Sequence, residues 1–510
     1  SSAQLLTDWV DDEGKLNEEG FQANSKSFGV RPAIWVSKDS LILTGQNSEK
    51  SAEFTFGDFK YILLEDSTIE ITKYTGKSAA VTIPAEINGK RVTSIGDGAF
   101  FRCGSVLSVE IPDSIINIGE GVFGGDSQLN SIIVSSDNPA LEIKDGVLFS
   151  KADKRLVYCP GREDETYIIP DGTEIIGDNA FLNYNCRSLK EIIIPNSVKK
   201  IGNSSFSNCR NLLSIAIPEQ ITSIGDNAFY SCYDLAEIKL PDSLTFIGDF
   251  AFAFCYDLEN IIIPKSVQNV GDSLFQGCSK ISIELADDHQ YLEVIDGVLF
   301  SKTDSRLVWC PSSKSGTYRM PNRTKIIGAE AFWHCERLRN IELPDTIEEI
   351  RDHAFSYCKK ISTFELTEHV RKLGENVFEG CSGLSEITVT ANSPYFYVQD
   401  GMLFQKEEGR LVYCPRNASG IITLPDGVQI IGSYAFSGCQ DITRVYMPDS
   451  VTSIEESAFY GCTKLTRLKL SANLTTIGGW SFSLCKRLME VELPYGLKAI
   501  GSYAFFECER

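Results

Sequence analysis

The sequence has few histidines, few methionines, a deficit of basic residues and no long hydrophobic run. Its 510 residues include only 4 histidines and 4 methionines. No hydrophobic run approaches the roughly 20 residues of a membrane-spanning helix. Basic residues are outnumbered, because 48 lysines and arginines face 69 aspartates and glutamates, which gives a formal net charge of −21. Nucleic acids and anionic membrane surfaces attract clustered cations. The composition therefore argues against both as partners and predicts an acidic surface that keeps the chain soluble or attracts basic partners.

Common catalytic and cofactor motifs are also missing. The sequence has no Gly-x-Ser-x-Gly, His-Glu-x-x-His or Walker pattern. Residues 119–124 spell a dinucleotide-binding fingerprint, but they lack a strand–helix context and Phe123 stands at a repeated core position. The histidines are scattered without metal-ligand spacing, at His289, His334, His353 and His369. We therefore expect no enzyme activity, no cofactor and no metal.

What the sequence does contain is a repeat. The pattern Ile-Gly-x-x-Ala-Phe-x-x-Cys recurs along the chain, most often at intervals of 23 residues. Its phenylalanines are Phe100, Phe123, Phe181, Phe206, Phe229, Phe252, Phe275, Phe332, Phe355, Phe378, Phe436, Phe459, Phe482 and Phe505. One interval is 25 residues, because Tyr184 and Asn185 lengthen a turn, and three intervals of 57 or 58 residues contain a second kind of unit. This periodicity predicts stacked repeats in place of several globular domains.

The first part of each short unit has the pattern of a strand. In the unit that begins at Leu189, Ile192 and Ile194 alternate with neighbours that can face the other side. Pro195 lacks an N–H, which ends the strand and turns the chain. No unit can bury its apolar side alone, so equivalent strands should stack about 4.8 Å apart in a parallel sheet.

The second part of the unit predicts the core. Val198 and Ile201 point inward, and Gly202 permits a tight bend. Phe206 fills the space between layers, and Cys209 closes the turn as a small buried hydrophobe. The predicted fold is therefore a solenoid of coils of about 23 residues, mostly strand and irregular, with little helix.

The longer intervals contain a second motif in three copies. Each copy has two apolar runs joined by a polar segment, which predicts a β-hairpin that projects at one edge while it stays in the stack. The runs are 145–151 with 156–160, 296–302 with 307–311, and 400–404 with 411–415.

Sixteen cysteines raise the question of disulfides or zinc. Thirteen follow the repeat phenylalanine and three lie in the hairpin motif, and no two have the close spacing of a zinc site. Stacked parallel side chains point the wrong way for short Cβ contacts, so we expect free buried thiols. In a secreted protein, free thiols would indicate a reducing or anaerobic environment.

The consensus Ile-Pro-x-Ser-Val-x-x-Ile-Gly-x-x-Ala-Phe-x-x-Cys, with its Asp-Gly-Val-Leu-Phe insert, resembles the BspA-like leucine-rich-repeat family. The resemblance covers residues 57–510. It implies a leucine-rich-repeat solenoid on a secreted or cell-surface bacterial protein, and it implies adhesion to host matrix proteins for some members. The family has no shared catalytic residues.

The two ends of the chain differ from the repeat. Residues 1–56 are predicted to be a separate segment, in which 28–36 resemble the closing strand of a C-type-lectin-like or formylglycine-generating-enzyme-like bacterial surface domain. A cap over the first coil is the alternative. The chain opens at Ser1 without a leader pattern, which fits a cytoplasmic protein, a mature chain or a trimmed one. It ends at Arg510 inside a repeat.

Aromatic residues flank several repeat cysteines, where a turn is expected. Two groups should cluster because their members come from adjacent coils. The first is Tyr230, Tyr233, Phe254 and Tyr256, and the second is Trp333, His334 and Tyr357. Contiguous exposed aromatics are typical of protein or glycan contacts, but aromatics can also pack against neighbouring turns and seal the stack.

Two functions are consistent with these features. The first is a surface-exposed recognition or adhesion module that binds a protein or glycan on one face. The second is a structural spacer that holds an upstream domain away from the cell. The ligand, the oligomeric state and the mode of surface attachment are not specified by the sequence.

Overall fold

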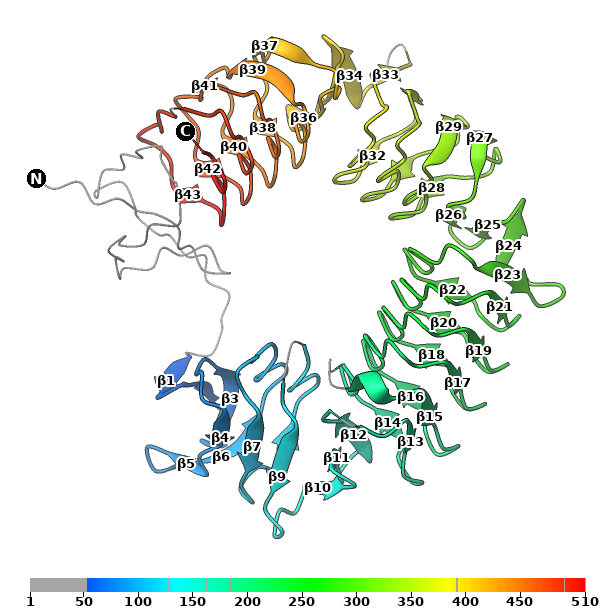
Figure 1. Cartoon of the computed structure of the whole chain (residues 1–510), viewed down its shortest axis with the longest axis vertical. Coiled ribbons are helices and arrows are strands. Elements are labelled where there is room, and N and C mark those ends of the chain that lie inside the picture. The colour runs from blue at the N-terminus through cyan, green and yellow to red at the C-terminus, as the bar shows by residue number, and fades with distance from the viewer. Residues whose placement is uncertain are drawn as a thin grey trace, which may run out of the picture. The chain divides into compact units, whose positions relative to one another are not determined.

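The computed structural model describes residues 53–125, 128–161, 163–182, 186–390, 393–489 and 491–509. They form two compact units, which meet in the sequence between Pro311 and Ser312. We call residues 53–311 the first unit and residues 312–509 the second unit. Strands and irregular turns build both units (Figure 1), and the described residues contain a single helical turn, η2 (Cys186–Ser188). The prediction of a solenoid with little helix is confirmed. Residues 28–36 lie outside the described residues.

Each regular coil of the first unit contributes a short strand to a parallel ladder. The pairing order is β13-β15-β17-β19, and β21 pairs with β23 in the same way. In β15, Ile192 is buried between exposed Glu191 and Ile193, as the alternation predicted. The strands are β13 (Thr166–Ile168), β15 (Glu191–Ile193), β17 (Ser214–Ala216), β19 (Glu237–Lys239), β21 (Asn260–Ile263) and β23 (Ser282–Leu285).

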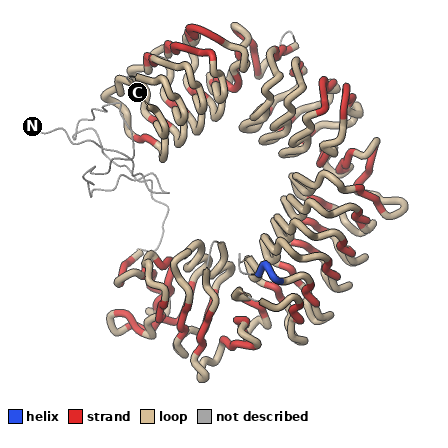
Figure 2. The backbone as a smooth tube through the Cα atoms, viewed as in Figure 1, coloured by secondary structure: helices blue, strands red, loops and turns tan. Residues whose placement is uncertain are grey.

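A second parallel ladder runs through the same coils and was not predicted as strand. Its members contain only two residues each, in which the second is buried, and they pair in the order β14-β16-β18-β20-β22. Figure 1 shows the two ladders on different sides of the coils, and Figure 2 shows the irregular chain that connects them. The strands are β14 (Ile175–Ile176), β16 (Lys200–Ile201), β18 (Ser223–Ile224), β20 (Phe246–Ile247) and β22 (Asn269–Val270).

The turns around the repeat phenylalanine are also joined from coil to coil. The Phe206 N–H donates to the Ala228 carbonyl at 2.9 Å, and the Phe229 N–H donates to the Ala251 carbonyl at 2.8 Å. These bonds satisfy main-chain groups that would otherwise be buried without partners. Each coil is therefore bonded to the next at the turns as well as along both strand ladders.

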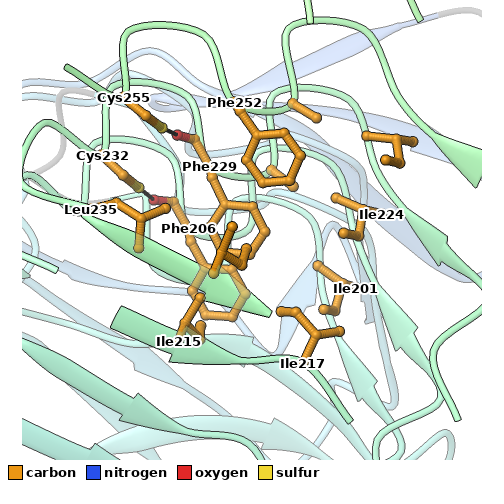
Figure 3. Packing of buried hydrophobic residues seen from close by; sticks show 14 of the residues in the cluster. Ile201, Phe206, Ile215, Ile217, Ile224, Phe229, Cys232, Leu235, Phe252 and Cys255 are labelled. Carbon is orange, nitrogen blue, oxygen red and sulfur yellow. Dashed lines mark hydrogen bonds between the residues drawn. The ribbon is translucent and has the colours of Figure 1, made fainter. Parts of the chain in front are cut away.

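The core between the ladders is a stack of phenylalanine rings. Phe206, Phe229 and Phe252 lie above one another with centroids 5.2 and 5.6 Å apart (Figure 3). All three side chains are fully buried, as are Val198 and Cys209. The inward positions predicted for the repeat are confirmed, and burial of such rings is the main stabilising contribution of a coil.

Each long unit is a three-stranded antiparallel meander inserted into the stack. The predicted hairpins are confirmed, and a strand before each of them was not predicted. The hairpin strands of the first copy are buried throughout, and its turn at 151–154 is exposed. The strands are β10 (Leu141–Lys144), β11 (Val147–Ser150), β12 (Arg155–Tyr158), β24 (Leu292–Ile295), β25 (Val298–Ser301), β26 (Arg306–Trp309), β34 (Phe396–Gln399), β35 (Met402–Gln405) and β36 (Arg410–Tyr413).

The aromatic residue at the end of each meander continues the phenylalanine stack. Tyr158 lies 5.6 Å from Phe123, Trp309 lies 5.9 Å from Phe275, and Tyr413 lies 5.6 Å from Phe378, as ring-centroid distances. Each meander thus places an aromatic ring against the last repeat phenylalanine before it.

The first unit begins with an antiparallel sheet. Strands β1, β2 and β3 form a meander, and β3 then pairs in parallel with β6. The strands before the first long unit are β1 (Phe54–Phe56), β2 (Phe59–Leu63), β3 (Ile69–Tyr74), β4 (Ala80–Thr82), β5 (Glu86–Ile87), β6 (Lys90–Ile95), β7 (Ser108–Ile111), β8 (Asn117–Ile118) and β9 (Ser131–Val134).

The second unit repeats this coil architecture. The strands that correspond to the first ladder are β27 (Ser315–Arg319), β29 (Arg337–Glu342), β31 (Thr363–Leu366), β33 (Glu386–Val389), β37 (Ser419–Thr423), β39 (Asp441–Tyr446) and β41 (Arg467–Lys469). Its two-residue strands are β28 (Ile326–Ile327), β30 (Glu349–Ile350), β32 (Lys372–Leu373), β38 (Ile430–Ile431), β40 (Ser453–Ile454), β42 (Thr476–Ile477) and β43 (Ala499–Ile500).

Candidate binding site

The turn that carries the repeat phenylalanine contains two main-chain positions with left-handed conformation. One lies two residues before the phenylalanine, and we call the stacked set of these positions the first column. The other lies two residues after it, and we call that set the second column. Every described residue in both columns has a positive φ, between 52° and 90°. Glycine and asparagine adopt this conformation easily, whereas it costs other residues about 1 kcal/mol.

Many coils follow this preference. The first column has Gly98, Gly121, Asn179, Asn227 and Asn376, with Ser204, Ser273 and Ser457. The second column has Gly125, Gly277, Gly380, Gly438 and Gly461, with Asn208 and Ser231. Other coils place large side chains at the same positions: Phe250, His353, Tyr434, Trp480 and Tyr503 in the first column, and Phe254, His334, Tyr357 and Leu484 in the second. These coils carry a bulky residue where the main chain favours a small one.

The structure brings the first predicted aromatic group together on two adjacent coils. Tyr230 contacts Phe254 edge-on with ring centroids 5.3 Å apart, and Phe254 contacts Tyr256 at 6.1 Å. Tyr233 lies against Tyr256 at 5.0 Å. Tyr256 is 43% exposed, and the other three rings are half-buried. The four residues therefore form one continuous aromatic surface, whose binding role remains a prediction.

The surroundings of the first group fix its rings. A Cβ added at Gly277 would lie 2.7 Å from Phe254 Cδ1, so the Phe254 ring lies directly on a glycine of the following coil. The Arg210 guanidinium lies 4.9 Å from the Tyr233 centroid, a cation–π contact. Burial and the neighbouring Tyr233 raise the pKa of Tyr256 above its usual value, so its phenol stays neutral at physiological pH.

The second predicted group is also assembled from adjacent coils. His334 stacks on Tyr357 with centroids 4.6 Å apart and an interplanar angle of 19°. Trp333 contacts His334 at 4.0 Å and Tyr357 at 6.5 Å. A Cβ added at Gly380 would lie 2.5 Å from Tyr357 Cδ1, so this ring also lies on a glycine of the next coil. All three residues are half-buried.

The second group is surrounded by polar partners. His334 Nδ1 lies 3.1 Å from Glu336 Oε1, and Lys359 Nζ donates to the same oxygen at 2.8 Å. The bond from Lys359 is the main reason that the pKa of Glu336 falls below its usual value. Tyr357 Oη donates to Glu379 Oε1 at 2.8 Å. Burial and this bond to Glu379 raise the pKa of Tyr357 to about 12.

Three turn-side aromatics near the chain's last coils were missed at the sequence level. Trp480 stacks on Tyr503 with centroids 4.5 Å apart, and Phe506 contacts both rings edge-on. Trp480 and Tyr503 occupy the first column, which is recognised by its left-handed main chain in the structure. The aromatics predicted from the sequence flank the repeat cysteine, so Phe250, His353 and Tyr434 in the first column were not among them.

The cysteines, which could in principle react or bind a metal ion, occupy structural positions. All sixteen cysteines are free, and all are buried except Cys103, which is half-exposed. In the described part of the chain, no three His, Cys, Asp or Glu side chains converge as a metal site would require. Within those same residues, no helix is long and apolar enough to cross a membrane.

Three similar proteins of known structure are bacterial. A leucine-rich cell surface protein from Faecalibacterium prausnitzii is 25% identical, with a TM-score of 0.38, over 88% of this chain and 96% of the other. A leucine-rich repeat protein from Eubacterium ventriosum is 18% identical, with a TM-score of 0.36, over 90% and 96%. The pneumococcal vaccine antigen PcpA is 17% identical, with a TM-score of 0.35, over 85% and 94%. No curated protein matches the sequence.

The family is shown by the sequence itself. Residues 50–154, 163–282, 309–405 and 413–510 match the BspA-type leucine-rich-repeat region in six copies, well over half of the chain. The matched segments contain both aromatic groups, whereas most of the second long unit, β24 to β26, lies between two of the segments. The chain belongs to the BspA-type leucine-rich-repeat family.

Proposed function

We propose that this protein is a non-catalytic recognition module, secreted or held at the bacterial cell surface, which binds a protein or glycan through the aromatic side chains of its turns. The two aromatic groups defined above are the proposed contact residues. Membership of a bacterial leucine-rich-repeat family supports a protein-binding role. A similar solved structure is described as a cell surface protein, which supports the proposed location.

The observation that carries the proposal is the conformation of Phe254, His334 and Tyr357. Each has a left-handed main chain, with φ of 60°, 55° and 60°, at a position where other coils have glycine, asparagine or serine. A ring at such a position costs folding free energy that glycine or asparagine would not. Selection for a stable coil alone would favour the small residue, so the rings are best explained by contact with a ligand.

The geometry also suits recognition. Tyrosine and tryptophan provide large contact areas at a low cost in conformational entropy, and they dominate binding energy in many interfaces. The rings of the first group contact one another, and Phe254 is braced by Gly277, so little ordering is required on binding. The net charge of −21 disfavours nucleic acid and anionic membranes as the ligand.

The test is binding of the full chain to a panel of matrix proteins and glycans at two salt concentrations. The Tyr233→Ser/Tyr256→Ser double variant should lose at least tenfold in affinity, which corresponds to about 1.4 kcal/mol. Two further variants use residues that other coils already have. Phe254→Gly copies Gly277, and Tyr357→Gly copies Gly380.

Stability separates recognition from a purely structural role. If the rings serve a ligand, Phe254→Gly and Tyr357→Gly should weaken binding while the melting temperature stays the same or rises. If the rings only seal the stack, both variants should lower the melting temperature, and no member of the panel should bind the parent protein. That second outcome would favour the spacer function.

A further inference from the structure

The second aromatic group lies beside a cluster of ionisable residues from three consecutive coils. Glu330, His353 and Asn376 occupy the first column one above the other, with φ of 54°, 54° and 52°. His353 Nδ1 lies 3.0 Å from Glu379 Oε2, and the other oxygen of the same carboxylate accepts the bond from Tyr357. One carboxylate therefore holds both the imidazole and a ring of the proposed binding surface.

The bonds of His353 depend on its charge. Asn376 Nδ2 lies 3.5 Å from His353 Nε2, an arrangement that suits a neutral imidazole with its proton on Nδ1. Asn376 Oδ1 is buried and has no hydrogen-bond partner in the part of the chain that the structure describes. A second proton on the imidazole requires an acceptor at Nε2, which the Asn376 amide can provide by turning its oxygen toward the ring. Proton binding is thus coupled to a change in side-chain orientation.

Glu330 adds a second site for a proton. Its Oε2 is buried without a hydrogen-bond partner among the described residues. An ionised carboxylate in this position lacks the donors that would replace water. Burial raises the pKa of Glu330 to about 7, and the positive charge of His353 opposes this shift. The bond to Glu379 raises the pKa of His353 above its usual value despite burial.

Other charged residues nearby also favour the charged forms of His353 and Glu379. Asp352 favours the charged form of His353, and Arg416 favours the ionised form of Glu379. The bond with His353 is the main cause of the lowered pKa of Glu379. Tyr434 and Tyr460 face Tyr357, and Glu336 pairs with His334 and Lys359. At slightly acidic pH the cluster therefore contains a charged His353 bonded to a charged Glu379, with a neutral Glu330 beside them.

We propose that proton binding by Glu330 and His353 acts through Glu379 to position Tyr357 and His334, which makes the second aromatic group responsive to pH between about 6 and 8. At low pH the charged imidazole holds Glu379 and so keeps Tyr357 in its stack on His334. At high pH Glu330 is charged, His353 is neutral, and this constraint weakens. The first aromatic group contains no histidine and is not responsive. The inference rests on the proposed function for its biological meaning, but its test needs no ligand.

The test follows the four histidines by NMR in the full chain labelled at histidine Cε1, with signals assigned from single variants. Trp333 is followed by acrylamide quenching, as the difference between the parent and Trp333→Ser, which copies Ser356 at the same repeat position. We expect His353 to titrate with a midpoint above 6.5, and Trp333 to become more accessible as pH rises through that midpoint. Glu379→Gln should lower the midpoint by about one unit.

Two variants copied from other coils serve as controls. His353→Asn, as at Asn376, should remove the pH dependence of Trp333 with the fold intact by circular dichroism. Glu330→Ser, as at Ser273, should lower the His353 midpoint because a negative neighbour is lost. A midpoint at or below 6.5 would overturn the proposal, and so would a Trp333 signal that stays flat while His353 titrates. Either result leaves ligand binding by the aromatic surface untouched, so the two proposals fail separately.

Discussion

At the cysteine position of the repeat, a thiol in one coil donates to a main-chain carbonyl in the coil before it. Cys232 Sγ lies 3.2 Å from the Phe206 carbonyl oxygen, and Cys255 Sγ lies 3.3 Å from that of Phe229 (Figure 3). The same bond recurs at Cys278, Cys358, Cys381, Cys462, Cys485 and Cys508. The sequence predicted small buried residues here, but it could not predict this bond, because the acceptor belongs to another coil.

Burial should make almost all of these thiols unreactive in the folded protein. It raises the pKa of Cys278 to about 12 and those of Cys209, Cys232 and Cys255 well above their usual value. Iodoacetamide at pH 8 should therefore modify Cys103 first, because this thiol alone is half-exposed, and peptide mapping by mass spectrometry would show it. Denaturant should expose the rest. Equal labelling of all sixteen in the native protein would contradict the burial described.

His289 should make the first unit sensitive to acid. Its Nε2 is 3.0 Å from the Pro264 carbonyl oxygen, and its Nδ1 accepts the Leu292 N–H at 3.0 Å, so the ring is held neutral. Burial is the main cause that lowers its pKa below 6.5. The unfolded chain then binds a proton more readily, so this contribution to stability is complete above about pH 6.5 and is lost as pH falls toward the folded-state pKa.

The control for that effect is already present in the chain. Asn138 stands at the equivalent position, where it bonds to the Pro112 carbonyl and accepts the Leu141 N–H. Between pH 7 and 5, the free energy of unfolding of the parent should fall further than that of His289→Asn, as measured by urea denaturation. Parallel pH profiles for the two proteins would show that His289 does not titrate as described.

At the scale of elements, the first two long units are each held by an arginine as well as by their strands. Arg306 in β26 is buried, pairs with Asp272 and with Asp304, and donates to the Val270 carbonyl at 2.6 Å. Arg155 makes the corresponding bond to the Ile118 carbonyl at 2.6 Å. The arginine thus donates a hydrogen bond to the last carbonyl of a two-residue strand, at the point where the long unit interrupts the regular repeat.

Removal of this arginine should destabilise the long unit. Arg306→Met leaves Asp272 and the Val270 carbonyl without their donor, at a cost of about 3 kcal/mol. Hydrogen exchange should show the loss in β24–β26. Lys199→Ala is the matched control, because Lys199 pairs with Glu174 at the exposed surface and should contribute less than about 0.5 kcal/mol. Similar losses in the two variants would argue against a structural role for the arginine.

The elements also show where prediction from sequence ended. The strand at Glu191–Ile193 was predictable, because alternation and a following proline mark it. The strand at Lys200–Ile201 was not, because two residues are too few to show a period and its partners are one coil away. The candidate site was predictable only in part. The aromatics beside a repeat cysteine could be predicted from the sequence. His353 and Trp480 could not, because they are distinguished by a left-handed main chain that only the structure shows.

At the scale of the molecule, stability should be transmitted only between neighbouring coils. Phe229 contacts Phe206 and Phe252. Phe229→Ala should cost about 3 to 5 kcal/mol and should reduce hydrogen-exchange protection most in the adjoining coils, with smaller effects farther along the first unit. Ile193→Ala, on the exposed side of β15, should change stability by less than about 0.5 kcal/mol. A uniform loss of protection throughout the unit would indicate a single cooperative core.

The 23-residue spacing has a consequence at the level of the gene. Loss of residues 227–249 would join Asp226 to Phe250 and preserve the pattern Ile-Gly-Asp-x-Ala-Phe of the coil that follows. The ladders and the ring stack would close over the deletion, but Tyr230 and Tyr233 would be gone, and Arg210 would become the neighbour of Tyr256. Unequal recombination between repeats can therefore rewrite the order of side chains along the turns in one step, while the core that supports them is copied unchanged.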